Sequence, residues 1–197
     1  MGPDLLLASR SPRRRELLEQ IGVRYACVDV EVDEMPARGE TPADFVLRLA
    51  REKARAGRRG AGGDLPVLPA DTAVVAGDDI LGKPRDEADA LRMMRLLSGR
   101  GHRVLTGVAL VAGSEHTRLS ETRVWFRDVT EGEARAYWRS GEPADKAGGY
   151  AVQGLGALFI RWLEGSYSGV MGLPLYETGE LLQYCGIQLI DRSQGRP

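Results

Sequence analysis

Three consecutive arginines, Arg13, Arg14 and Arg15, stand where a helix is expected to begin. Ser11 can cap this helix and Pro12 suits its first position, so the arginines occupy the first turn. The free N–H groups of a helix N-terminus already carry partial positive charge, which makes cations unfavourable there. A bound anion would remove the conflict, because the N–H groups and the guanidinium groups would both attract it. We therefore predict a phosphate site at Arg13 and Arg14, while Arg15 keeps the alternative interpretation of a solvated basic residue.

Lys53 is a charged residue within an apolar pattern. A helix predicted over residues 42–56 places Val46, Leu49 and Ala50 on one buried face, and Lys53 falls on that face. In one interpretation the lysine stem covers the core and the amine reaches water. In the other, the amine projects inward toward an anion. The position alone does not decide between the two.

Two carboxylates stand out by their surroundings. Glu34 closes a segment predicted as a strand at 25–32, and Asp71 interrupts the apolar run LPVLPADTAVV. A carboxylate in such a strand requires a metal, a cation or strong hydrogen bonds. A structural ion pair, with Lys83 as the partner, is the alternative. Because no His/Cys cluster is present, a metal held by these groups would be hard and oxygen-ligated, either Mg²⁺ or Mn²⁺.

Several glycine-rich stretches could bind a ligand. The segment GDDILGKP resembles a P-loop, but Pro84 replaces the residue that would bind Mg²⁺, so we interpret the match as false. Lys83 could still reach the same site as Asp71. Residues 154–156 (GLG) lack the third glycine of a dinucleotide fingerprint. The segments DKAGGYAVQG and GSYSGVMGLP are typical of loops that close over a ligand, with simple turns as the alternative. Gln153 carries both a donor and an acceptor, which suits the edge of a nucleobase.

Alternating strands and helices must position these residues. Cap signals predict helices that begin after Ser11, Thr41, Asp86 and Thr130, and a last helix at 174–184. Strands are predicted at 5–8, 25–32, 65–76, 79–81, 103–112, 119–129 and 158–163, with a flexible connector at 57–64. This order predicts one α/β domain over residues 1–197, with a mixed twisted sheet flanked by helices.

The composition excludes several classes of function. The 27 basic and 28 acidic residues give a net charge of −1, which argues against wholesale binding of nucleic acid or of an anionic membrane. Two cysteines in apolar settings, Cys27 and Cys185, indicate reduced, packed thiols rather than a disulfide framework. No segment has the length of a signal peptide core or a membrane span. We expect a soluble, cytoplasmic protein, and the oligomeric state stays open, with a homodimer among the alternatives.

Together these motifs resemble the Maf family of nucleoside triphosphate pyrophosphatases. The resemblance rests on stretches that follow one another in family order over almost the whole chain: LASRSPRRRELL, REKA, ADT, GKP, TGV, DKAGGYAVQG and GSYSGVMGLPL. It implies a fold akin to inosine triphosphate pyrophosphatases, with a cleft between two lobes. It also implies hydrolysis of a nucleotide to its monophosphate and pyrophosphate with Mg²⁺ or Mn²⁺.

The resemblance also indicates the substrate. Relatives that act on dTTP and UTP carry Arg after Ser-Pro, Thr after the catalytic Asp and Gln in the last glycine-rich loop, which correspond to Arg13, Thr72 and Gln153. The sequence departs from the family pattern at Gly169, where Asn is usual, and at Met171, where Val is usual. The expected substrates are therefore dTTP, UTP and modified pyrimidine nucleotides.

The mechanism that the resemblance implies gives each candidate residue a role. Asp71 and Glu34 bind the metal, and either could deprotonate the water that attacks the α-phosphorus. Thr72 and Gln153 read the pyrimidine, and the phosphates are held by Ser9, Ser11, Arg13, Arg14, Lys53 and Lys83. A nucleotide-binding regulator of septum formation, without important turnover, is the alternative.

Overall fold

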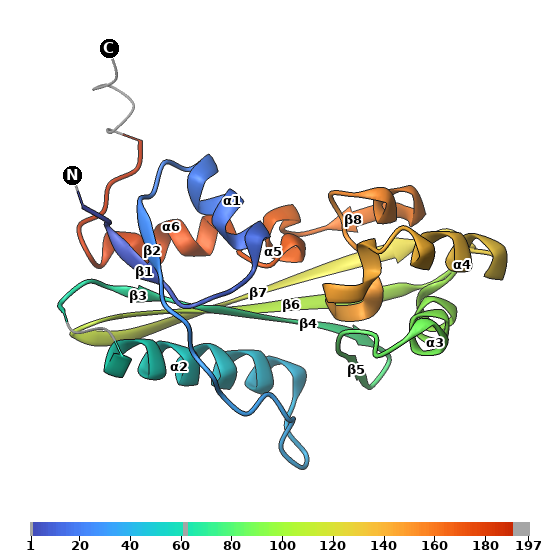
Figure 1. Cartoon of the computed structure of the whole chain (residues 1–197), viewed down its shortest axis with the longest axis horizontal. Helices are drawn as coiled ribbons and strands as arrows, with labels where there is room; N and C mark the ends of the chain where they lie inside the picture. Colours follow the sequence, from blue (N-terminus) through green and yellow to red (C-terminus); the bar gives the residue numbers. More distant parts are fainter. Residues whose placement is uncertain (1, 61–62, 191–197) are drawn as a thin grey trace. The chain divides into compact units, whose positions relative to one another are not determined.

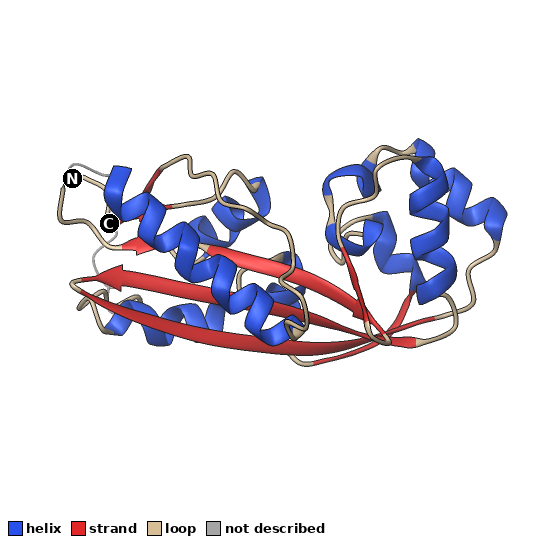
Figure 2. Ribbon diagram, turned by 90° about the horizontal axis from the view of Figure 1, so that it is seen from below, coloured by secondary structure: helices blue, strands red, loops and turns tan. Residues whose placement is uncertain are grey.

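A computed structural model describes residues 2–60 and 63–190 of the chain (Figure 1). The backbone divides into two compact units, each assembled from separate parts of the chain. The first takes Met1–Asp71, Thr106–Leu119 and Gly172–Pro197, and the second takes Thr72–Leu105 and Ser120–Met171. Both units contain helices and strands (Figure 2), so the predicted α/β class is confirmed.

The first unit is built on a mixed sheet around β1 (Leu5–Leu7). β1 pairs in parallel with β2 (Tyr25–Cys27) on one side and with β3 (Val67–Leu68) on the other. β3 in turn pairs antiparallel with β6 (Gly101–Ala112). Helix α1 (Pro12–Gln20) connects β1 to β2 and buries Leu17 and Leu18. A helical crossover between parallel strands is the connection that such a pair requires.

Helix α2 (Pro42–Gly60) lies on one side of these strands, whereas α1 and α6 (Leu175–Gln183) lie on the other (Figure 1). The close approach of α2 to β6 depends on Gly107 of β6, where a Cβ would lie 2.6 Å from the carbonyl oxygen of Val46 on α2. Only glycine permits that contact. The buried face of α2 includes Val46, Leu49 and Ala50, as predicted, and Lys53 is buried with them.

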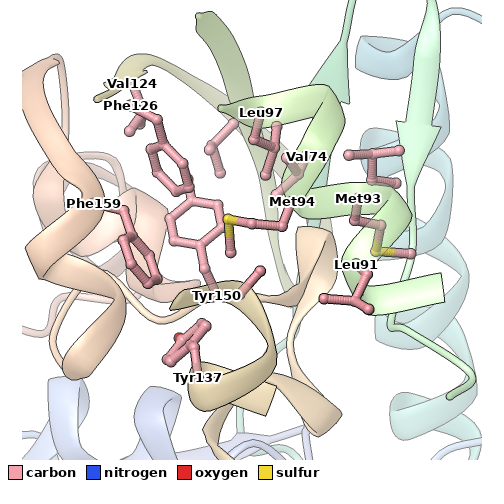
Figure 3. Close-up of a cluster of buried hydrophobic side chains, with 13 residues drawn as sticks. Val74, Leu91, Met93, Met94, Leu97, Val124, Phe126, Tyr137, Tyr150 and Phe159 are labelled. Carbon is pink, nitrogen blue, oxygen red and sulfur yellow. The ribbon is translucent and has the colours of Figure 1, made fainter. Parts of the chain in front are cut away.

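The second unit encloses an aromatic core (Figure 3). β4 (Ala70–Ala76) and β5 (Asp79–Leu81) form a hairpin, and β7 (Ser114–Phe126) pairs antiparallel with β8 (Ile160–Glu164). Helices α3 (Glu87–Leu97) and α4 (Glu131–Arg139) add Met94 and Tyr137 to the core. The Tyr150 ring lies among Phe126, Phe159 and Met94, with its centroid 4.9 Å from that of Phe126.

Four short helices were not predicted, and one of them includes Leu158 and Phe159, which the sequence predicted as the start of a strand. Three are 3₁₀ helices, η1 (Glu142–Asp145), η2 (Ala147–Gly149) and η3 (Leu155–Phe159), and the fourth is α5 (Tyr167–Met171). All four are five residues or shorter, too short to show a helical period in the sequence, so no pattern predicts them.

Some predicted boundaries are wrong. β2 ends at Cys27 instead of continuing to residue 32, and the segment predicted as one strand at 65–76 is interrupted at Pro69, which has no N–H to donate. α2 extends to Gly60, into the predicted connector, of which residues 61–62 lie outside the described residues. Cys27 and Cys185 are free thiols, but Cys27 is exposed rather than packed. Among the described residues, no helix combines the length and the apolar character that a membrane span requires.

Candidate phosphate and catalytic site

Lys53 lies between two carboxylates in the first unit. Its Nζ is 2.6 Å from Oδ1 of Asp71 and 2.6 Å from Oε1 of Glu34. The side chains of Lys53 and Asp71 are 11% and 12% exposed, whereas that of Glu34 is 59% exposed. The amine therefore projects inward, and the cation that pairs with Asp71 is Lys53. Helix α2 supplies the lysine and β4 the aspartate, while Glu34 belongs to the irregular segment after β2.

Arg14 is held in place by hydrogen bonds on both sides of its guanidinium group. Its Nε donates to the carbonyl oxygen of Gly172 at 2.6 Å, and its Nη1 donates to Oγ of Ser9 at 3.0 Å. The same hydroxyl oxygen accepts a hydrogen bond from the backbone N–H of Ser11 at 3.2 Å. Two of the predicted phosphate ligands, Ser9 and Arg14, are thus brought together at the start of α1. The role of Gly172 was not predicted, because a backbone carbonyl leaves no side-chain signal in the sequence.

The electrostatics of Arg14 link the arginines to the carboxylates. Burial lowers the pKa of the Arg14 guanidinium below its ordinary value, and the adjacent charge of Arg13 lowers it further. The charges of Asp71 and Glu34 act in the opposite direction and raise the pKa of Arg14. Two cations and two carboxylates therefore share one electrostatic environment, in which a bound anion would favour the charged guanidinium.

The first turn of α1 has the features of an anion site. Ser11 is the N-cap residue in an extended conformation, as predicted, but its side chain makes no capping hydrogen bond. No acidic residue lies in the first turn. Arg15 differs from the prediction: it is half-buried rather than solvated, and its Nε has no hydrogen-bond partner within the described part of the chain.

The remaining predicted residues, Thr72, Lys83 and Gln153, belong to the second unit. Lys83 is exposed on the turn between β5 and α3, and the neighbouring Gly82 carbonyl accepts a hydrogen bond of 2.9 Å from the N–H of Gly148. Val74 shares a face of β4 with Thr72. Gly148 packs closely against Val74, since a Cβ at position 148 would lie 2.8 Å from Cγ1 of Val74. Within the second unit, Gly148 of the AGGY stretch thus lies against Gly82 of GKP and against Val74 of β4, and Gln153 lies exposed on a turn a few residues further on.

The donor chemistry around Lys53 fits a hard divalent cation. Within residues 2–60 and 63–190, no three His, Cys, Asp or Glu side chains come together as a metal cluster. Asp71 and Glu34 direct two carboxylate oxygens toward a single cation, the Lys53 ammonium. Mg²⁺ is commonly bound by one or two carboxylates together with the phosphates of a substrate. Asp71 and Glu34 could supply the two carboxylates of such a site.

Comparisons with known proteins give the same assignment as the motifs. The Maf-like protein family matches residues 4–185. A dTTP/UTP pyrophosphatase of Alkalilimnicola ehrlichii is 57% identical over 91% of this chain and 92% of its own length. A dTTP/UTP pyrophosphatase of Vibrio cholerae is 51% identical over 90% of this chain and 96% of its own length. The crystal structure of a dITP/XTP pyrophosphatase from Mycobacterium abscessus aligns with a TM-score of 0.40 and 20% identity over 62% of this chain and 73% of its own. The family match and the relatives together show that the chain belongs to the Maf family.

Proposed function

We propose that this protein hydrolyses dTTP and UTP to the nucleoside monophosphate and pyrophosphate. The relatives at 51–57% identity carry the name dTTP/UTP pyrophosphatase, and they align over at least nine-tenths of this chain. The observation that carries the proposal is the buried Lys53 held between Asp71 and Glu34, in the same electrostatic environment as Arg13 and Arg14. Simple binding of a nucleotide does not require a buried carboxylate, here Asp71, beside a polyanion.

The triphosphate is bound by cations and by neutral donors. Arg13 and Arg14 donate to phosphate oxygens, and Arg14 is already oriented by Gly172 and Ser9. The Ser11 hydroxyl and the first-turn N–H groups of α1 add neutral donors. Lys53 and Lys83 contribute further positive charge to the phosphates. These interactions neutralise charge on the leaving pyrophosphate.

Asp71 is the group that we assign to proton transfer. Its carboxylate accepts a proton from the attacking water, whose oxygen forms a bond to the α-phosphorus while the bond to the bridging oxygen of the β-phosphate breaks. Lys53 fixes the orientation of this carboxylate, and Glu34 is the second candidate base. A divalent metal, Mg²⁺ or Mn²⁺, held by Asp71 and Glu34, supplies further neutralisation of the phosphate charge when bound.

Thr72 and Gln153 are the residues that we assign to the pyrimidine. Uracil and thymine share an N–H donor flanked by carbonyl acceptors, and the amide of Gln153 offers the complementary acceptor and donor. Modified pyrimidines that keep this edge are expected to be substrates as well.

Product analysis with a panel of nucleoside triphosphates and Mg²⁺ tests the proposal. The expected result is monophosphate and pyrophosphate, with UTP and dTTP hydrolysed faster than CTP or purine nucleotides. Release of diphosphate and orthophosphate, or no turnover of any nucleotide, would contradict the proposal.

A further inference from the structure

Tyr137 and Glu142 form a hydrogen-bonded pair in the second unit that the mechanism above does not use. Tyr137 is on α4 and is 5% exposed, and Glu142 begins η1. The Tyr137 hydroxyl donates to Oε1 of Glu142 at 2.6 Å. Neither residue attracts notice in the sequence, because a tyrosine on an amphipathic helix and a glutamate after it are both common.

This pair holds backbone on both sides of Gln153. Before Gln153, the N–H of Ala151 donates to the Tyr137 hydroxyl oxygen at 3.0 Å. After Gln153, the N–H groups of Leu155 and Gly156 donate to the two carboxylate oxygens of Glu142 at 2.9 and 3.0 Å. Three backbone amides within six residues are therefore fixed to two side chains.

The pair also accounts for the glycines of the GLG segment. A Cβ at Gly154 would overlap the Glu142 carboxylate. A Cβ at Gly156 would lie 2.7 Å from both the Tyr137 hydroxyl oxygen and the Ala151 carbonyl oxygen. The two glycines let the backbone approach the tyrosine–glutamate pair, which is a different purpose from the dinucleotide binding that the spacing superficially suggests.

We propose that Tyr137 and Glu142 are positioning residues for pyrimidine selectivity, which act by fixing the backbone that carries Gln153. The proposal rests on the function proposed above. An amide can present either its acceptor or its donor to a base, depending on its orientation and position. Uracil and cytosine differ in this pattern, because the O4 acceptor of uracil is replaced by an amino donor in cytosine. Gln153 can therefore discriminate between them only if its backbone is held in one place.

The protonation states support the hydrogen-bond directions. Burial, and then the bond to Glu142, raise the pKa of the Tyr137 phenol well above neutrality, so the hydroxyl keeps its proton. Burial acts to raise the pKa of Glu142, but the donors from Tyr137, Gly156 and Leu155 outweigh it and the pKa is lowered overall. Glu142 is thus an ionised acceptor at neutral pH, with three donors directed at it.

Two variants test the proposal through substrate selectivity. Tyr137→Phe removes the hydroxyl and keeps the ring, and Glu142→Gln replaces a carboxylate oxygen by an amide donor that faces other donors. We expect the ratio of kcat/KM for UTP to that for CTP to fall about tenfold or more in each, chiefly through a higher KM for UTP. Tyr176→Phe, at a side chain that is 76% exposed, and Glu131→Gln, at an exposed ion pair, are matched controls that should keep the wild-type ratio.

The outcomes separate this inference from the proposed function. If the wild-type protein does not prefer UTP to CTP, the proposed function fails. If the wild type does prefer UTP and both variants keep its ratio, or lose activity on both nucleotides equally, the inference is overturned. Amide hydrogen exchange on the wild type gives a test that does not depend on folded variants: Ala151, Leu155 and Gly156 should be protected relative to Gln153, and rapid exchange at all three would overturn the proposal.

Discussion

Replacing Lys53 by methionine tests the arrangement of charges around it, because the substitution keeps the apolar stem and removes the ammonium. Asp71, with its side chain 12% exposed, would become a buried charge without its cation, and breaking such a pair costs about 3–5 kcal/mol. Glu34 adds little, since its side chain is 59% exposed and solvent screens its interaction. We expect Lys53→Met to lower the free energy of unfolding by about 3 kcal/mol. For a chain of this length that corresponds to a decrease in Tm of roughly 6–12 °C.

The assay is urea unfolding of four proteins, with the wild type as reference. Arg55→Met is the matched control on the same helix: Arg55 pairs with Glu115 at 2.8 Å but its side chain is 59% exposed, so its loss should cost less than about 1 kcal/mol. In the double variant Lys53→Met with Asp71→Asn, removal of both charges should restore most of the lost stability. The reasoning is refuted if Lys53→Met costs no more than Arg55→Met, or if the double variant is no more stable than Lys53→Met.

Three further predictions concern catalysis, anion binding and pH. Asp71→Asn should reduce the turnover of UTP roughly 10²-fold or more, measured by pyrophosphate release, and near-normal turnover would remove Asp71 from proton transfer. Pyrophosphate at a hundred times its Kd should stabilise the wild type by about 2.7 kcal/mol in thermal unfolding. That gain should be largely lost in Arg14→Ala and kept in Arg15→Ala, and equal loss in both would reject the division between the two arginines. Burial lowers the pKa of His102 from its ordinary 6.5 to about 4, so between these values the unfolded chain binds a proton that the folded chain does not. Stability should therefore fall as pH falls through this window, by about 3 kcal/mol in total, and His102→Phe should remove this part of the pH dependence in urea unfolding; an unchanged slope would contradict the assignment.

The starts of the longer helices were the part of the fold most accessible from sequence, because their signals are local. Ser11-Pro12, Asp86 and the Thr130–Glu133 capping box each mark the helix start found in the structure. Strand extents were less accessible, since a strand depends on a partner that is distant in the sequence. The alternating residues at 28–32 have the strand pattern, yet the described backbone continues after Cys27 without a strand.

The candidate site shows the same division between local and distant information. The sequence showed that Lys53 and Asp71 are charged residues within apolar patterns. It did not show that they pair with each other, because that pairing depends on how α2 packs against the sheet through Gly107. Tyr137 and Glu142 were missed for a different reason. Their contacts are with backbone N–H groups, which every residue other than proline has, so no pattern of side chains identifies them.

Hydrolysis of UTP in ¹⁸O-labelled water with Mg²⁺ tests the central claim most directly. Attack of water on the α-phosphorus predicts that the label enters UMP, and that the pyrophosphate remains unlabelled. Label in the pyrophosphate, or products that are UDP and orthophosphate, would contradict the account.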